Sequence, residues 1–448
     1  MGNLTTPLTV QKLQSALHAK AKAEPRYRFY LLYDKVYRAD VLAHAYRCCK
    51  ANKGAAGVDG QRFEDIEAYG EETWLGELAS SLKGKTYEPQ AVRRVWIPKP
   101  HSEKLRPLGI PTITDRVVQT AMLLALEPIF EADLAPEQYA YRRDRGAQDA
   151  VRAVHGLLNT GHTQVVDADL SGYFDSIPHA ELMKCVARRV VDRHILRLIK
   201  AWLVAAVEDD DGKEEQEKRA TTRSRANRDN KRGTPQGAPI SPLLSNLYMR
   251  RFLEGWRRLG HQQKWSAYIV NYADDFVICC KHGADNAMDA MRKMMDRLKL
   301  TVNEEKTHLC QIPQERFDFL GYTFGRCYSR KNGRAYIGTK PSSKSIKRMV
   351  DSVSEVTDRR KGWLPAEEVV SRLNRKLTGW ANYFCLGPVS PAYHLVDAHV
   401  QERLRRWLCK KHKIAGTGTS RFPAQYLYEE LGLVKLAPRT HDLPWAKA

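Results

Sequence analysis

Residues 270–278 read VNYADDFVI and place two adjacent aspartates, Asp274 and Asp275, between apolar residues. A carboxylate is costly to bury without a partner, so this pattern needs a physical reason. Aspartate is common in turns, and a surface hairpin turn is therefore one explanation. The apolar residues on both sides count against an exposed turn. We expect two short strands over residues 268–280 that meet at a functional pair of carboxylates.

A third aspartate, Asp169, lies at the end of another apolar stretch, VVDADL at residues 165–170. Two strands that bring three carboxylates together create strong mutual repulsion, which a bound cation relieves. Hard oxygen ligands suit Mg²⁺, which takes its remaining ligands from water and phosphate. Two such ions, about 3.5–4 Å apart, activate the attacking oxygen and stabilise the leaving oxygen in phosphoryl transfer. These residues therefore predict a magnesium-dependent phosphoryl-transfer site.

The composition indicates a large protein with an anionic partner. The chain has 448 residues, which predicts two or three domains. Its formal net charge is +21, more than solubility requires, and this excess favours nucleic acid as the partner. No run of about 18 or more apolar residues occurs, which argues against a membrane-spanning segment. The nine cysteines include no CxxC pair, which argues against a zinc ribbon and fits reduced thiols in the cytosol.

Hydrophobic periodicity outlines the elements of the chain. Residues 115–130 place their apolar side chains on one face of a helix. Residues 208–232 mix acidic and basic side chains with alanine as the only apolar residue, so we expect a flexible insertion that builds no core. Further helices are expected over residues 1–50, 179–205 and 284–299, strands over 165–170 and 317–324, and a domain boundary near 340–347, before a second helical region.

Two basic residues, Lys99 and Arg106, flank the loop IPKPHSEKLRPLGIP at residues 97–111. A triphosphate substrate needs such cations near the carboxylates, and this pair is placed to clamp one. Ordinary surface charge explains the same two residues equally well.

The order of motifs resembles the reverse transcriptases of bacterial group II introns. YADD alone is a weak signal, but the ordered set around it is specific. The set comprises IPKP and RPLGIP (97–111), DADLSGYFDSI (167–177), GTPQGAPISPLLSN (233–246), NYADD (271–275), LTVNEEKTHL (300–309) and FLGYTF (319–324). NKGAAGVDG (52–60) resembles the family's N-terminal extension, and RLNRKLTGWANYF (372–384) with QERLRRWLCKKHK (401–413) resembles its maturase or thumb domain. The resemblance covers nearly all of the chain.

The resemblance implies an α+β right-hand polymerase, with fingers and an antiparallel palm sheet followed by an α-helical thumb. The implied domains are an N-terminal extension with the start of the fingers (1–90), fingers and palm (91–335), a thumb or maturase domain (336–415) and a short tail (416–448). The tail shows no cysteine pairs or His-rich box of an HNH endonuclease, which many relatives carry, so we expect none.

The resemblance also implies roles for individual residues. The implied catalytic residues are Asp169, Asp274, Asp275 and Lys306, and the implied ligands of two Mg²⁺ ions, for which Mn²⁺ can substitute, are Asp169, Leu170, Asp274 and Asp275. Phe174 is the implied steric gate against a ribose 2′-hydroxyl, with core packing as the alternative. The implied contacts with the deoxynucleotide are Lys99, Arg106, Leu170, Ser171, Gly172, Tyr173, Phe174, Gln236 and Gly237, and those with the RNA template are Arg142 and Arg145.

The implied activity is RNA-directed DNA synthesis, joined to binding of structured intron RNA that assists splicing and mobility. The implied partners are deoxynucleotides, an RNA template with its DNA primer and target DNA, in the bacterial cytoplasm beside the nucleoid. Trp380 is a candidate aromatic RNA contact, although its helical spacing favours the core. Two alternatives remain: a stand-alone relative used in DNA repair or phage defence, and a non-catalytic RNA-binding splicing factor.

Overall fold

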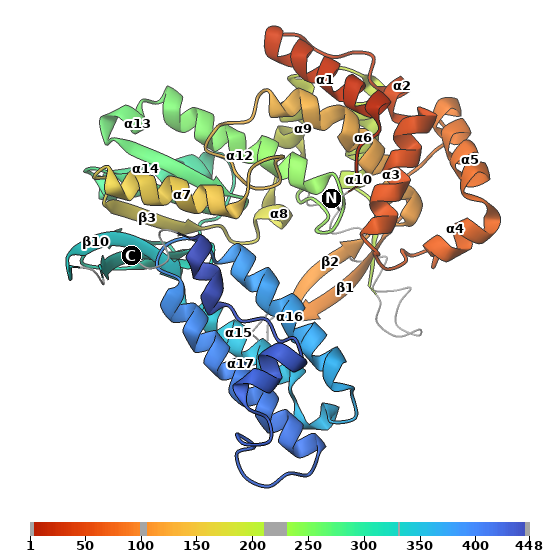
Figure 1. Ribbon diagram of the computed structural model, residues 1–448. Coiled ribbons are helices and arrows are strands. Elements are labelled where there is room, and N and C mark those ends of the chain that lie inside the picture. The colour runs from red at the N-terminus through yellow and green to blue at the C-terminus, as the bar shows by residue number, and fades with distance from the viewer. Residues whose placement is uncertain (1–3, 99–104, 210–230, 330–331, 444–448) are drawn as a thin grey trace.

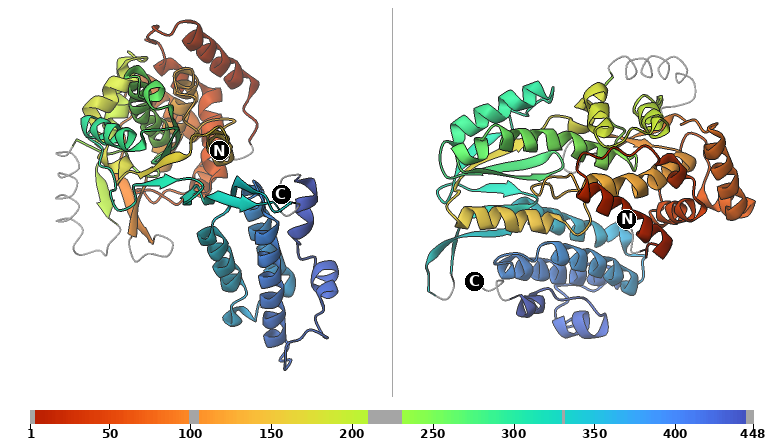
Figure 2. Two further views of the ribbon diagram at one scale, coloured as in Figure 1. Left: turned by 90° about the vertical axis from the view of Figure 1, so that its left-hand side faces the viewer. Right: turned by 90° about the horizontal axis from the view of Figure 1, so that it is seen from above.

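The computed structural model describes residues 4–98, 105–209, 231–329 and 332–443. Its elements form the expected α+β right-hand arrangement, in which a body of helices around a central sheet is followed by a helical bundle (Figure 1). Seen from the side, the bundle extends away from that body (Figure 2). Among the described residues, no helix is both long and apolar enough to cross a membrane.

The N-terminal half of the body is built around α6 (Ile113–Glu131), a helix whose side chains are almost all buried. Thr112 begins this helix: its hydroxyl accepts a hydrogen bond from the Asp115 N–H at 3.1 Å, which satisfies a backbone donor of the first turn. The helices that lie before α6 in the chain are α1 (Leu8–Ala23), α2 (Tyr33–Val36), α3 (Ala39–Ala51), α4 (Phe63–Tyr69) and α5 (Glu71–Gly84).

A hairpin of two strands projects beside these helices (Figure 1). Strands β1 (Val92–Pro98) and β2 (Leu105–Ile110) pair antiparallel, and β4 (Val207–Asp209) adds to β1 in parallel. The register pairs Arg106 with Ile97, so Arg106 lies near the open end of the hairpin.

The central sheet has the strand order β5-β6-β3-β7, with antiparallel neighbours throughout. Side chains alternate between its two faces, so Ala168 joins the core that includes α12 (Ser241–Arg258), whereas Val165 joins a second core that includes α7 (Ala147–Asn159). The strands are β3 (Gln164–Asp169), β5 (Ala267–Tyr272), β6 (Asp275–Cys280) and β7 (His308–Gln311). The remaining helices of the body are α8 (Tyr173–Ser176), α9 (His179–Ala187), α10 (Arg193–Leu203), α13 (His261–Lys264) and α14 (Ala284–Arg297).

A small antiparallel sheet, ordered β10-β9-β8, leads from the body into the helical bundle. Its strands are β8 (Phe317–Phe319), β9 (Tyr322–Tyr328) and β10 (Ala335–Pro341). The bundle packs its own apolar core from α15 (Ser343–Val356), α16 (Ala366–Tyr383) and α17 (Ser390–Lys411). Three short helical turns complete it: η1 (Arg359–Lys361), η2 (Tyr426–Glu430) and η3 (Ala437–Asp442).

Two predicted elements are divided in the structure. The strand expected over residues 317–324 breaks at Leu320 and Gly321, which both adopt positive φ angles and form the turn between β8 and β9. The helix expected over residues 179–205 is two helices, because the Asp192 carboxylate caps α10 and also accepts the N–H groups of Leu32 and Tyr33. Residues 210–230 of the predicted insertion lie outside the described residues, and the predicted domain boundaries stay a prediction.

Candidate active site

The strand ends of the central sheet bring the predicted aspartates together. Asp169 is the last residue of β3 and lies directly opposite Asp275, the first residue of β6. Opposed residues of an antiparallel pair project from the same face of the sheet. Asp274 directly precedes Asp275 in the tight turn from β5 to β6, where Ala273 has a φ of 59°. The hairpin-turn explanation is therefore correct for the backbone, and the turn holds the carboxylates as a group.

The electrostatics of this group favour a bound cation. Burial is the main cause that raises the pKa of Asp275 to about 7, and the charges of Asp274 and Asp169 add to the effect. Burial also raises the pKa of Asp274, again with a contribution from Asp169. A fourth carboxylate, Asp167, lies two residues before Asp169 on the same face, and burial raises its pKa to about 6. Each of these groups ionises at a cost that a nearby positive charge would relieve.

Asp169 is held by two side chains from the segment before β7. The Lys306 ammonium donates to Asp169 Oδ2 at 2.9 Å, and the Asn303 amide donates to the same oxygen at 3.1 Å. The hydrogen bond to Asp169 is the main cause that raises the pKa of Lys306, so the lysine stays charged while it holds the carboxylate. The sequence analysis did not predict a role for Asn303. Its place within the motif LTVNEEKTHL was the signal that could have indicated one.

The predicted set of metal ligands, Asp169, Leu170, Asp274 and Asp275, stays a prediction. In the part of the chain that the structure describes, no group of three or more His, Cys, Asp or Glu side chains is placed to hold a metal ion. The hydrogen bonds from Lys306 and Asn303 occupy one oxygen of Asp169. Mg²⁺ uses one or two protein carboxylates with water and substrate phosphate. The opposed pair of Asp169 and Asp275 fits that requirement by its oxygen donors and its charge.

A chain of hydrogen bonds links the fingers hairpin to the turn after β3. Arg106 Nε donates to Gln236 Oε1 at 3.0 Å, and Gln236 Nε2 donates to Asp175 Oδ2 at 2.9 Å. Asp175 and Gln236 border a cavity of about 220 Å³ between β1, β2 and residues 232–236. Arg106 and Gln236 are therefore brought together as predicted, whereas Lys99 lies outside the described residues. Asp175 was missed, and its signal was its place inside DADLSGYFDSI.

Gly237 explains why this loop needs a glycine. Its φ is 113°, and a Cβ there would lie 2.4 Å from the Gly109 carbonyl oxygen of β2. The close approach is fixed by the Gly109 N–H, which donates to the Gln236 carbonyl at 2.6 Å. A side chain at position 237 would push the loop away from β2 and disturb Gln236.

The comparison with known proteins agrees with this geometry. Residues 97–324 match the family model described as reverse transcriptase (RNA-dependent DNA polymerase), and residues 346–422 match that of the group II intron, maturase-specific domain. The chain belongs to the reverse transcriptase family. It is an RNA-directed DNA polymerase of the group II intron type, and members of this family use divalent metal ions. The stand-alone and non-catalytic alternatives are not favoured.

Three relatives that match over most of this chain support the same assignment. Protein YkfC of Escherichia coli is 33% identical over 376 residues, which cover 75% of this chain and 94% of the relative. The group II intron-encoded protein LtrA of Lactococcus lactis is 26% identical over 441 residues, which cover 80% of this chain and 71% of the relative. A putative COX1/OXI3 intron 1 protein of Saccharomyces cerevisiae is 23% identical over 334 residues, 63% of this chain and 38% of the relative.

The turn after β3 places the remaining predicted nucleotide contacts of the reverse transcriptase. Gly172 begins α8 with a φ of 55°, and Ser171 is exposed, but the Ser171 N–H already donates to the Thr301 carbonyl at 2.9 Å. Leu170 is buried, and its neighbour Tyr173 is buried as well, with its hydroxyl donating to the Ser245 carbonyl at 2.6 Å. The Tyr173 side chain therefore supports the core, and the contact of Tyr173 with the nucleotide stays a prediction.

Phe174 is 9% exposed and belongs to the main hydrophobic core. Core packing, the alternative weighed from the sequence, therefore describes most of its surface. Its carbonyl accepts the Thr234 N–H at 2.7 Å, which joins α8 to the GTPQG loop. Phe174 directly precedes Asp175 in the chain, and the Asp175 carboxylate accepts the hydrogen bond from Gln236.

The two predicted template-binding arginines differ. Arg142 is 5% exposed and forms a salt bridge with Glu131, and it also donates to the carbonyls of Ala135 and Gln138 at 2.8 and 2.9 Å. These partners hold the guanidinium inside the protein, so the predicted contact of Arg142 with RNA is not supported. Arg145 is partly exposed, donates to the Pro136 carbonyl and lies over the Tyr139 ring at 5.6 Å.

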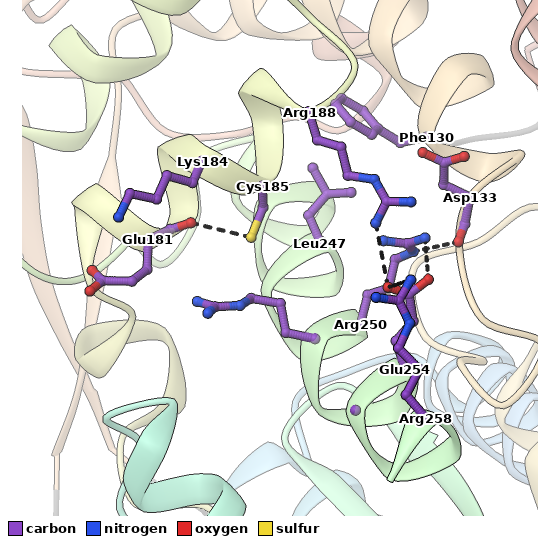
Figure 3. A pocket seen from close by; sticks show the side chains of 12 residues that line it. Phe130, Asp133, Glu181, Lys184, Cys185, Arg188, Leu247, Arg250, Glu254 and Arg258 are labelled. Atoms are coloured by element: carbon purple, nitrogen blue, oxygen red, sulfur yellow. Dashed lines mark hydrogen bonds and ion pairs between the residues drawn. The ribbon is translucent and has the colours of Figure 1, made fainter. Parts of the chain in front are cut away.

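A second, basic pocket lies between α9 and α12, outside the carboxylate site (Figure 3). Its volume is about 340 Å³. Arg188, directly after α9, and Arg250 of α12 converge on Glu254, with N–O distances of 3.4 and 2.5 Å. The lining basic residues are Lys184, Arg188, Arg250, Arg251 and Arg258, against the acidic residues Asp133, Glu181 and Glu254. Sequence reasoning did not find this pocket, because its charges come from two helices far apart in the chain.

Proposed function

We propose that the carboxylate site copies RNA into complementary DNA with Asp169, Asp274 and Asp275 as its catalytic acids. The observation that carries this proposal is the pairing of Asp169 with Asp275 across β3 and β6, beside Asp274 in the turn. The raised pKa values of Asp274 and Asp275 mark a site that needs positive charge for both carboxyls to ionise fully. Two Mg²⁺ ions, with Mn²⁺ as a substitute, would supply that charge, activate the primer hydroxyl and stabilise the leaving pyrophosphate.

The surrounding residues orient the reactants. Lys306 and Asn303 hold Asp169 Oδ2, which leaves the other oxygen of this carboxylate for a ligand. Lys306 remains a candidate donor of a proton to the leaving group, since its ammonium already lies at the site. Arg106, with Lys99, is proposed to contact the triphosphate, and Gln236 and Gly237 the base pair that forms. Leu170, Ser171, Gly172 and Phe174 are proposed to border the sugar and phosphates, with Phe174 as the gate.

A single-turnover incorporation assay tests the carboxylate proposal. Asp169→Asn removes the charge without a large change in shape, and Asp167→Asn is the matched control two residues away on the same face. We expect a loss of incorporation of roughly a hundredfold or more for Asp169→Asn, because the variant lacks a carboxylate charge that stabilises the transition state. Asp167→Asn should retain most of the activity. Equal activity of wild type and Asp169→Asn would refute the proposal.

We also propose that structured intron RNA binds to basic surfaces outside the cleft and that the protein assists its splicing. In the basic pocket, neither Arg251 nor Lys184 forms an ion pair with another described residue. Both are therefore candidates to bind RNA phosphates. Target DNA, an RNA template with its DNA primer and deoxynucleotides complete the proposed partners, and the bacterial cytoplasm beside the nucleoid is the proposed location.

The aromatic RNA contact is proposed at Trp363 instead of Trp380. Trp380 packs against Phe384 and Tyr393 with ring centroids 5.1 and 5.8 Å apart, as its helical spacing predicted. Trp363 is 77% exposed and lies two residues after the basic turn η1. An exposed tryptophan beside clustered cations suits base stacking combined with phosphate contact.

The exposure of Trp363 is fixed by its neighbours in the chain. Lys411 of α17 donates to the carbonyls of Gly362 and Leu364 at 3.0 and 2.8 Å. Leu364 is 2% exposed and anchors the loop in the core of the bundle. The ring between them is therefore presented to solvent by a tethered loop.

A further inference from the structure

A cavity of about 400 Å³ lies away from the carboxylates, where the body meets the helical bundle. Its walls are the second half of α7, residues 336–339 of β10 and residues 386–388 between α16 and α17. This volume lies within the range of small-molecule sites, about 300–1,000 Å³. None of its lining residues takes part in the polymerase site proposed above.

A glycine inside α7 leaves this cavity open. Gly156 lies in the last turn of the helix, where its carbonyl accepts the N–H of the C-cap residue Thr160. A Cβ at this position would meet no atom within 4 Å. Gly156 is exposed at the mouth of the cavity, so a larger side chain at this position would project into the cavity without a clash with the protein.

Two hydroxyl groups of the cavity wall lack a hydrogen-bond partner within the described chain. They are Thr339 Oγ1, on a residue that is 4% exposed, and the phenol oxygen of Tyr336. A buried polar group without a partner costs about 1–3 kcal/mol. A ligand whose edge carries donors and acceptors would satisfy both groups.

The remaining wall combines flat, apolar and cationic groups. Val151, Ile337 and Leu386 supply apolar surface. The His155 imidazole bonds to the backbone of Ile337, and burial lowers the pKa of His155, so the ring is neutral at neutral pH. Arg152 is 55% exposed and its guanidinium lies 2.8 Å from Asp149. A flat ring with a polar edge would fit inside, and an attached anion would lie toward Arg152.

We propose that this cavity binds a nucleotide, with its base beside Gly156, Tyr336 and Thr339 and its phosphate toward Arg152. The site is separate from the polymerising site and goes beyond the proposed function. A free nucleoside monophosphate and an unpaired nucleotide of bound RNA share this chemistry. Either ligand would contact α7, β10 and the α16–α17 connection at once and would hold the bundle against the body.

Isothermal titration of the full chain with AMP, CMP, GMP and UMP tests the free-nucleotide source. EDTA is included so that the metal-dependent polymerase site does not contribute. We expect one or more of them to bind with a stoichiometry of one. Gly156→Leu should weaken binding roughly tenfold or more because its side chain fills the space, and Gly156→Ala is the smaller matched control. Leucine and alanine are strong helix formers, so both variants should fold.

Thr339→Val separates a binding role from a structural one. It removes the unpartnered hydroxyl at nearly constant volume, so the thermal stability of the free protein should be unchanged or higher, while nucleotide binding weakens. A loss of stability without a loss of binding would contradict the role given to this hydroxyl.

Photocrosslinking of 4-thiouridine RNA, mapped by mass spectrometry, tests the second source. A crosslink at His155 or Tyr336 that Gly156→Leu abolishes would assign the site to an unpaired RNA nucleotide. The proposal is overturned if no monophosphate binds and no such crosslink forms, or if Gly156→Leu changes neither. Because these readouts need no DNA synthesis, their failure is distinguishable from a failure of the polymerase proposal.

Discussion

Asp275 lowers the stability of the folded protein at neutral pH, because burial disfavours the charged form of its carboxyl. Its carboxyl is more acidic in the unfolded chain, with a pKa of about 3.9, than in the folded protein, where the value is about 7. Folding therefore favours the protonated form. The contribution of Asp275 to stability is least unfavourable below about pH 4 and becomes fully unfavourable above about pH 7.

Asp275→Asn should accordingly stabilise the metal-free protein, and more at pH 8 than at pH 5. Part of Asp275 is exposed to solvent, so we expect a gain on the order of 1 kcal/mol at pH 8. Thermal unfolding in EDTA measures it. Added Mg²⁺ should stabilise wild type more than the variant. A variant less stable than wild type at pH 8 without metal would contradict this explanation.

The sequence predicted which side chains come together when they lie at the ends of expected strands. It did not predict side-chain contacts between segments far apart in the chain. The sequence predicted that Asp169, Asp274 and Asp275 lie close together, because adjacent strands of a sheet bring their ends together. Arg142 was assigned to RNA because its sequence does not reveal Glu131, which binds its guanidinium in the fold. Asn303 was missed for the same reason, since its contact with Asp169 crosses between segments far apart in the chain.

At the scale of elements, the GTPQG loop depends on its fit to β2. The Gly109–Gln236 backbone bond and the Gly237 conformation bring the loop against the strand that carries Arg106. The motif predicted a tight turn, which the structure contains. The sequence could not show that β2 is the surface it approaches, just as it could not show the break at Leu320 and Gly321.

Gly237→Ala should therefore impair this loop. We expect a destabilisation of about 1–3 kcal/mol from the backbone conformation and a roughly tenfold or greater loss of primer extension from misplaced Gln236. Gly76→Ala in α5 is the control, because a Cβ there meets no atom within 4 Å and alanine favours the helix. Denaturant unfolding and extension rates measure both. Wild-type activity of Gly237→Ala would show that the close approach is dispensable.

The tethered loop at Trp363 leads to a second prediction at this scale. Trp363→Ala should weaken binding of single-stranded RNA by about 1–3 kcal/mol with little change in stability. Trp380→Ala should lower the stability with little change in RNA binding, because its ring packs in the core and its loss leaves a cavity. Filter binding and thermal unfolding of the two variants separate these effects. Unchanged RNA affinity in Trp363→Ala would contradict the proposed contact between Trp363 and RNA.

At the scale of the whole molecule, the net charge of +21 is distributed over surfaces well beyond the catalytic group. The basic pocket of α9 and α12 illustrates this, because Glu254 holds some of its arginines in place while Arg251 remains available. Such surfaces attract RNA without reading its sequence, and their affinity falls with salt.

Arg251→Gln combined with Lys184→Gln should reduce the salt dependence of RNA binding. Each lost phosphate contact lowers the slope of log K against log salt by about 1. Lys83→Gln on α5 is the control, because it removes an exposed charge from another element. Binding at several salt concentrations gives the slopes. A slope equal to that of the control would exclude this pocket from the RNA interface.

The central claim is that this chain is an RNA-directed DNA polymerase whose activity depends on the carboxylates at the ends of β3 and β6. Primer extension on an RNA template with Mg²⁺, comparing wild type with Asp274→Ala, tests it most directly. We predict full-length complementary DNA from wild type and none from the variant, with both proteins binding the template equally. Extension by Asp274→Ala at the wild-type rate would contradict the assigned site, and failure of wild type under all conditions would contradict the activity.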